Sequence, residues 1–238
     1  RWIDYRAPKV LVFPRPGYFV DRDKTMRWLS GWRKYLRRRK VLKEAVNRNE
    51  VLIKCIRANL MADWFARRLG CRVAMIVRHP CSVVESQLRL GHTWDPEPVR
   101  ARYRDNHRLH ELTDGRYVDL LNEEHTVVEA LTLNWVIENQ WPIERRWQGG
   151  YEVFFYEDLL EGGVSIWTKL CESLGLMQVP NPDLLERPSQ QSDPTSAQKR
   201  HEFRVPSWRS KIRANQLDEI QAILSATEFT IYNVESDR

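Results

Sequence analysis

The chain has 238 residues, of which 42% are hydrophobic and 29% are charged, as is ordinary for a soluble globular protein. It contains no internal repeat, no low-complexity tract and no run of about 18 apolar residues, so we expect no membrane span. The net charge is +6, and residues 33–43 are dense in Arg and Lys. This segment is either a solvated helix face or a surface that attracts anions. Because no nucleic-acid-binding signature accompanies it, we do not expect a nucleic acid partner.

The four cysteines, at positions 55, 71, 81 and 171, are scattered and form no CxxC pair. Such spacing favours reduced thiols of the core over disulfides or metal ligands. We therefore expect a cytoplasmic protein with no metal site.

The first half of the chain alternates between strand and helix patterns. A short extended run at 9–13 precedes a turn and a helix at about 24–47. From there the pattern gives a strand at 50–55, a helix at 59–69 that Asn59 caps and Gly70 ends, a strand at 73–77 and a helix at 81–90. This βαβ pattern predicts that the strands at 50–55 and 73–77 are parallel neighbours with a right-handed crossover.

The second half is mostly helical. A polar segment at 95–124 is predicted to be helical with irregular parts. The further predictions are a long packed helix at 126–147, a strand at 151–156, a helix at 158–175 capped by Asp158, a long loop at 178–206 and a last helix at 215–227. Residues 1–238 are expected to form a single domain.

The segment at 73–91 carries the clearest sign of function. An apolar strand ends at Arg78, His79 and Pro80 break the strand, and a helix follows that holds Ser86. An anion bound at this turn would meet Arg78, the N-terminus of the helix and the Ser86 hydroxyl.

Polar side chains follow three of the predicted strands. Lys54, Arg78 and Tyr156 each stand at a carboxyl end, which is where open α/β sheets bind their ligands. Two of the three are cations, so their convergence predicts a polyanionic ligand.

These residues resemble those of a known family. The spacing of Lys54, Arg78 and Ser86, together with FFYEDL at 154–159, is similar to the sulfotransferases that use 3′-phosphoadenosine 5′-phosphosulfate (PAPS). The segment VPSWRSKI, which contains Trp208, resembles a late loop of that family. The resemblance is closest to the bacterial-type enzymes.

The resemblance implies a P-loop nucleotide-kinase-like three-layer fold, with a central parallel sheet flanked by helices. It implies that Arg78 and Ser86 bind the 3′-phosphate and that Tyr156 lies near the adenine. The late basic loop departs from the family in its spacing; Lys199, Arg200 and Arg204 are near the right place, and we take Arg200 as a further ligand of PAPS. Lys54 is the expected catalytic cation, which would neutralise the sulfonate or the bridging oxygen. The acceptor would be a hydroxyl or amine on a small molecule or a carbohydrate.

The chain departs from the family in two further respects. No phosphosulfate loop is present, so we expect that loop to lie upstream of Arg1 and the chain to be a fragment. Where the animal enzymes carry a catalytic histidine, this chain has Ile56, which leaves the histidines at 92, 107 and 110 as possible bases. Two other functions stay open: a P-loop kinase or other phosphoryl transferase, and a non-catalytic protein that binds polyanions or glycans on the same scaffold.

Overall fold

The computed structural model describes residues 10–12, 52–55, 58–91, 95–176 and 208–235. The chain divides into two compact units, residues 1–58 and 59–238, and each is described by itself. It is an α/β protein in which the strands pair in parallel. The expectation of one domain over residues 1–238 stays a prediction.

The described part of the first unit contains one pair of short strands. Strand β1 (Val10–Val12) pairs in parallel with β2 (Leu52–Lys54), so that Val12 lies opposite Lys54. The helix predicted at 24–47 lies outside the described residues.

The second unit is built around strands β3 (Val73–Val77) and β4 (Tyr151–Phe155), which are parallel and in register from one end to the other. Strand β2 pairs with β1, and β3 pairs with β4. The predicted pairing of the strands at 50–55 and 73–77 would join the two units and stays a prediction. Apolar, β-branched composition identifies a strand, but it does not choose the partner.

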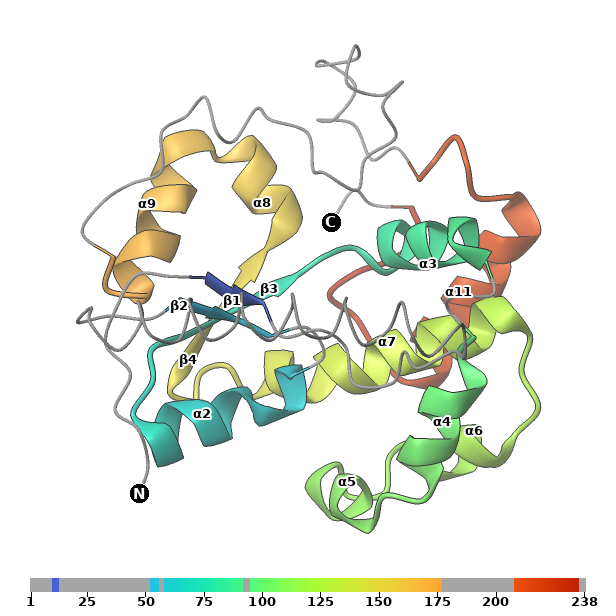
Figure 1. The fold of residues 1–238 in the computed structure, drawn as a ribbon. Coiled ribbons are helices and arrows are strands. Elements are labelled where there is room, and N and C mark those ends of the chain that lie inside the picture. Colours follow the sequence, from blue (N-terminus) through green and yellow to red (C-terminus); the bar gives the residue numbers. More distant parts are fainter. Residues whose placement is uncertain (1–9, 13–51, 56–57, 92–94, 177–207, 236–238) are drawn as a thin grey trace, which may run out of the picture. The chain divides into compact units, whose positions relative to one another are not determined.

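Helices cover both faces of the β3–β4 pair. Met75, Val77 and Phe155 point into the main core, whereas Phe154 packs on the opposite face with apolar residues of α8 (Tyr156–Glu161) and α9 (Gly163–Ser173). This split follows from the alternation of side chains along a strand. Figure 1 shows α8 and α9 on one side of these strands and α7 on the other.

The main core surrounds helix α7 (Val127–Glu144), most of whose residues are buried, including polar ones such as Asn139 and Gln140. It packs against α3 (Pro80–Arg89) and α11 (Ala214–Ala226). The predicted helices at 126–147 and 215–227 are thus confirmed to within a few residues.

The start of helix α2 (Ala62–Leu69) differs from its prediction. Residues Asn59–Met61 form a 3₁₀ turn, η1, and Met61 is the residue before α2. The Asn59 amide instead donates a hydrogen bond of 2.9 Å to Asn139 on α7, so Asn59 joins two helices rather than capping one. Gly70 does end α2, in the left-handed conformation at φ 63°.

The segment between α3 and α7 contains short helices, as its polar pattern indicated. These are α4 (Glu97–Arg104), α5 (His107–Leu112) and α6 (Val118–Asn122). Helix α4 packs against α6 and against α7.

The predicted single helix at 158–175 is wrong. Asp158 lies inside α8, and a second helix, α9, begins at Gly163, whose φ of 53° only glycine adopts readily. The prediction overlooked this backbone break. The predicted loop at 178–206 lies outside the described residues.

Several expected core residues lie at the surface. Trp64, which its helical spacing placed in the core, is 43% exposed. All four cysteines are free, but Cys55 and Cys71 are exposed whereas Cys81 and Cys171 are buried. Among the described residues, none of the helices has the length and apolar character needed to span a bilayer.

Candidate functional site

The ends of β3 and β4 bring two of the predicted site residues together. Val77 and Phe155 are register partners, so Arg78 and Tyr156, the next residue on each strand, emerge side by side. The guanidinium carbon of Arg78 lies 5.1 Å from the centroid of the Tyr156 ring. Arg78 is exposed and Tyr156 is half-buried. This pair forms the centre of the candidate site.

Arg78 is positioned to bind an anion. A guanidinium over the face of an aromatic ring near the protein surface is stabilised by about 0.5–1 kcal/mol. Within the described residues, Arg78 makes no ion pair with a carboxylate, so its N–H donors stay available.

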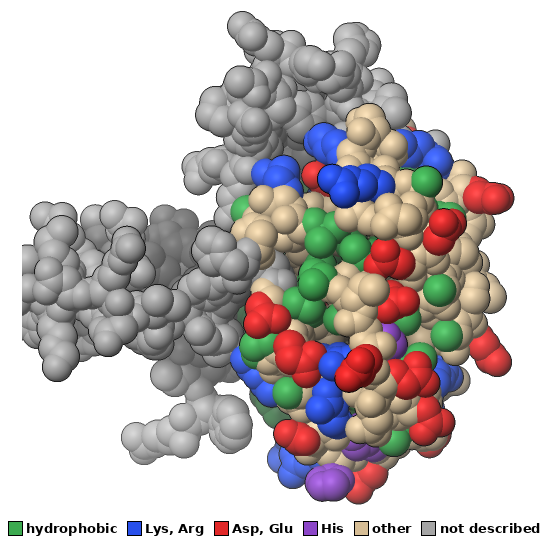
Figure 2. Space-filling view, turned by 90° about the vertical axis from the view of Figure 1, so that its right-hand side faces the viewer, with side chains coloured by type: hydrophobic (Ala, Val, Ile, Leu, Met, Phe, Trp, Pro, Cys, Tyr) green, Lys and Arg blue, Asp and Glu red, His purple; other side chains and the backbone are tan. Residues whose placement is uncertain are grey.

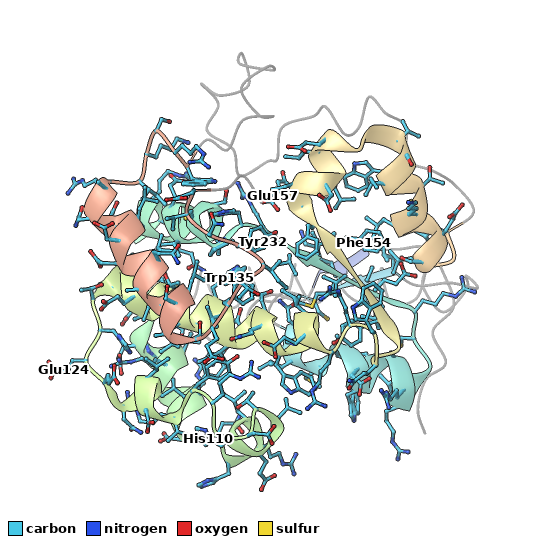
Figure 3. All side chains as sticks on the ribbon, turned by 180° about the vertical axis from the view of Figure 1, so that it is seen from behind. His110, Glu124, Trp135, Phe154, Glu157 and Tyr232 are labelled. Carbon is cyan, nitrogen blue, oxygen red and sulfur yellow. The ribbon has the colours of Figure 1, made fainter. Side chains whose placement is uncertain are left out.

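A carboxylate that the sequence did not reveal connects the two strand ends. Glu157 accepts a hydrogen bond of 2.9 Å from the backbone N–H of His79 and one of 2.8 Å from the Tyr232 hydroxyl. Figure 3 shows Glu157 and Tyr232 side by side. We call Glu157, His79 and Tyr232 the carboxylate latch. It holds the residue after Arg78 to the residue after Tyr156, and it anchors both to the C-terminal segment.

The His79 side chain is fully buried within this latch. Its Nδ1 accepts from the Cys81 backbone N–H at 3.2 Å, which places the ring proton on Nε2, and Nε2 lies 3.1 Å from the carbonyl oxygen of Asn233. The ring also stacks on Trp208, with centroids 4.8 Å apart. His79 is therefore the N-cap of α3, and Pro80 occupies the first helical position.

These contacts correct one expectation about the anion site. The N–H groups of His79 and Cys81 already have partners within the protein, and Pro80 has no N–H. The start of α3 therefore does not offer those groups to a ligand, and the Arg78 side chain is left as the principal donor.

Ser86 lies on the second turn of α3 and is partly buried. It lies six residues after Pro80, a rise of about 9 Å along the helix axis. An anion that contacts both Ser86 and Arg78 must therefore lie alongside α3 rather than on its end.

The other predicted site residues, Lys54 and Arg200, are not placed relative to Arg78. Lys54 is exposed at the end of β2, but it belongs to the first unit, so its convergence with Arg78 stays a prediction. Arg200 lies outside the described residues, as do Ile56 and His92.

No catalytic base emerges from the remaining candidates. His110 Nε2 lies 2.8 Å from the carbonyl oxygen of Arg104, and His107 packs against His110 on α5. Burial raises the pKa of the Cys81 thiol to about 12, so it is protonated at neutral pH and is not a nucleophile. In the part of the chain that the structure describes, no group of three His, Cys, Asp or Glu residues is arranged to hold a metal.

Comparisons with protein-family models, with curated proteins and with solved structures found no match. The function of the site is therefore inferred from its own residues and from their resemblance to sulfotransferase motifs.

Proposed function

We propose that the chain is a PAPS-dependent sulfotransferase domain with the P-loop nucleotide-kinase-like three-layer fold. It would transfer a sulfuryl group to a hydroxyl or amine on a small molecule or carbohydrate, in the cytoplasm. The observation that carries this proposal is the stacking of Arg78 on Tyr156 at the ends of two neighbouring parallel strands.

The chemistry of this pair suits one end of the co-substrate. A 3′-phosphoadenosine group combines a doubly charged phosphate with a flat aromatic base. A guanidinium binds phosphate oxygens through paired hydrogen bonds, and an aromatic ring offers a stacking surface for the base. The guanidinium carbon of Arg78 lies 5.1 Å from the centroid of the Tyr156 ring, so one ligand can reach both groups. In this proposal Ser86 adds its hydroxyl.

For the transfer step, the protein mainly has to position the reactants and stabilise the charge that develops. The acceptor oxygen or nitrogen would bond to sulfur as the bond between sulfur and the 5′-phosphate oxygen breaks. The acceptor proton would leave, and 3′-phosphoadenosine 5′-phosphate (PAP) would be released. In this proposal Lys54 neutralises the sulfonate or the bridging oxygen, and Arg200 adds a cation at the nucleotide.

Calorimetric titration with PAP tests the assignment of Arg78. We expect Arg78→Ala to weaken PAP binding by about 1.5–3 kcal/mol, the usual contribution of a hydrogen bond to a charged group. Arg68→Ala, on the exposed surface of α2, is the matched control and should leave the affinity unchanged. Equal affinities for the wild type and Arg78→Ala would refute the role of Arg78.

Turnover distinguishes the proposal from its alternatives. Labelled PAPS and ATP should each be offered with a panel of hydroxyl and amine acceptors. Sulfuryl transfer that Arg78→Ala abolishes supports the proposal. Phosphoryl transfer from ATP would indicate a kinase, and binding of polyanions without any transfer would indicate a binding protein.

A further inference from the structure

A second concave site lies on the C-terminal half of α3, away from Arg78 and Tyr156. It is a hollow of about 290 Å³ between α3 and the start of α11. It is lined by Glu85, Leu88, Arg89, Lys211, Ile212, Arg213 and Gln216. We call it the α3–α11 hollow.

The α3–α11 hollow is strongly cationic. Arg89, Lys211 and Arg213 all have exposed side chains, and the one carboxylate in the lining, Glu85, lies 3.6 Å from Arg89. Among the described residues, neither Lys211 nor Arg213 forms an ion pair. Figure 2 shows Lys and Arg side chains gathered at the upper end of the described part of one face.

The position of these cations is unfavourable for the fold alone. Arg213 immediately precedes α11, and the first turn of this helix of 13 residues contains no acidic side chain. The N-terminus of a helix carries a partial positive charge, so a cation placed there destabilises the helix. An anion bound in the hollow would neutralise Lys211, Arg213 and the helix end together.

The floor of the hollow is apolar and well fixed. Ile212 is 8% exposed, and Leu88 packs against the same core. The backbone N–H groups of Lys211 and Ile212 both donate to the carbonyl oxygen of Trp208, each at 2.9 Å, which holds the turn before α11 in place. A ligand here would place an apolar body on this floor and its charge among the cations.

We propose that the α3–α11 hollow binds an organic monoester of a tetrahedral oxyanion, a sulfate or a phosphate ester on an apolar body. Two guanidinium groups and an ammonium surround the oxyanion, and Leu88 and Ile212 contact the body. This site does not depend on the proposed sulfotransferase function, because neither Arg78 nor Tyr156 lines it.

The test uses the full chain. Calorimetry measures its affinity for phenyl sulfate and for phenyl phosphate, and thermal unfolding measures its melting temperature. Arg213→Glu should lower the affinity for the probe at least about tenfold, because a charge-assisted contact is replaced by repulsion. The same substitution places an acid at the start of α11, so it should raise the melting temperature of the free protein. Loss of binding with a gain in stability separates a binding role from a folding defect.

Arg102→Glu, an exposed arginine on α4, makes the same change in net charge and should leave probe binding unchanged. The proposal fails if the wild type binds neither probe, if Arg213→Glu binds as the wild type does, or if Arg102→Glu weakens binding equally. Inorganic sulfate should bind more weakly than phenyl sulfate, and equal binding would overturn the role of the apolar floor. Should Arg213→Glu fail to fold, Lys211→Gln must lower the affinity instead, and unchanged binding by that variant overturns the proposal.

Discussion

At the scale of single residues, β3 and β4 are each followed by two residues with different roles. Arg78 and Tyr156 stack at the surface. Of the residues that follow them, His79 donates its backbone N–H to Glu157, and Glu157 also accepts from the Tyr232 hydroxyl. A shift of one residue in the β3–β4 register would separate both pairs. The geometry of the candidate anion site is thus tied to the carboxylate latch behind it.

Removing the latch carboxylate should destabilise the protein. Glu157→Ala leaves the His79 N–H and the Tyr232 hydroxyl without their carboxylate acceptor, and we expect a loss of about 2 kcal/mol in the free energy of unfolding. Tyr232→Phe removes one of these bonds and should cost about 1 kcal/mol. Glu157→Gln should cost least of the three, because its amide can accept from His79 and donate to Tyr232. Urea unfolding of the three variants measures these differences.

The matched control for the latch is Glu152→Ala, an exposed carboxylate on β4. It should change the free energy of unfolding by less than about 0.5 kcal/mol, the usual range for a surface substitution. If Glu157→Ala and Glu152→Ala unfold alike, the two hydrogen bonds of Glu157 do not stabilise the fold.

At the scale of elements, α7 owes its start to a capping box. The Glu129 backbone N–H donates to the Thr126 hydroxyl at 3.2 Å, and the Thr126 N–H donates to the Glu129 carboxylate at 2.8 Å. The Thr126 hydroxyl also contacts the carboxylate of Glu219 on α11, so this cap connects two core helices.

Loss of this cap should therefore be measurable. Thr126→Ala is expected to lower the free energy of unfolding by about 1 kcal/mol, and Thr126→Ser should restore most of the loss. Thr168→Ala is the control, since its hydroxyl only bonds back to the Val164 carbonyl within α9. Chemical unfolding of the set checks this, and a Thr126→Ala protein as stable as Thr168→Ala would contradict it.

Local sequence patterns predicted where the helices and strands lie better than they predicted which strands pair. The spacing of the apolar residues located α7 and α11, because the residues that share one face of a helix are only three or four positions apart in the sequence. Strand pairing is not local: Val73 pairs with Tyr151, far along the sequence, and no nearby signal marks it. The break between α8 and α9 was missed although Gly162 and Gly163 mark it in the sequence, since adjacent glycines interrupt helices.

The same contrast holds for the candidate site: its residues at the strand ends were predictable, but the contacts that hold them were not. A cation and an aromatic residue after apolar strands identified Arg78 and Tyr156 as neighbours at a sheet edge. The sequence did not reveal Glu157 as a partner of His79, because a carboxylate that accepts a backbone N–H leaves no spacing pattern. Trp64 was misplaced because an amphipathic stripe shows which residues share a helix face, but not how far that face is covered.

At the scale of the whole molecule, burial keeps three groups of the described core, Cys81, Tyr117 and Tyr151, protonated to high pH. Burial raises the pKa of Cys81 from 9.0 to about 12, and that of Tyr117 and of Tyr151 from 10.0 to about 12. The Tyr117 hydroxyl donates to Gln140 at 2.9 Å, and the Tyr151 hydroxyl donates to the Pro142 carbonyl at 2.6 Å. The folded chain therefore keeps three protons that the unfolded chain releases at lower pH.

This difference predicts that stability declines at alkaline pH. Because the pKa values are raised by folding, their contribution is complete below about pH 9 and is lost as the pH rises towards about 12. Tyr117→Phe should be about 1 kcal/mol less stable than the wild type near neutral pH, where Gln140 loses its donor. The variant has one proton fewer to lose, so its stability should fall less steeply and the gap should narrow with rising pH. Urea unfolding under reducing conditions from about pH 8 to about pH 11 measures both slopes, and parallel declines would show that Tyr117 does not contribute to the alkaline transition.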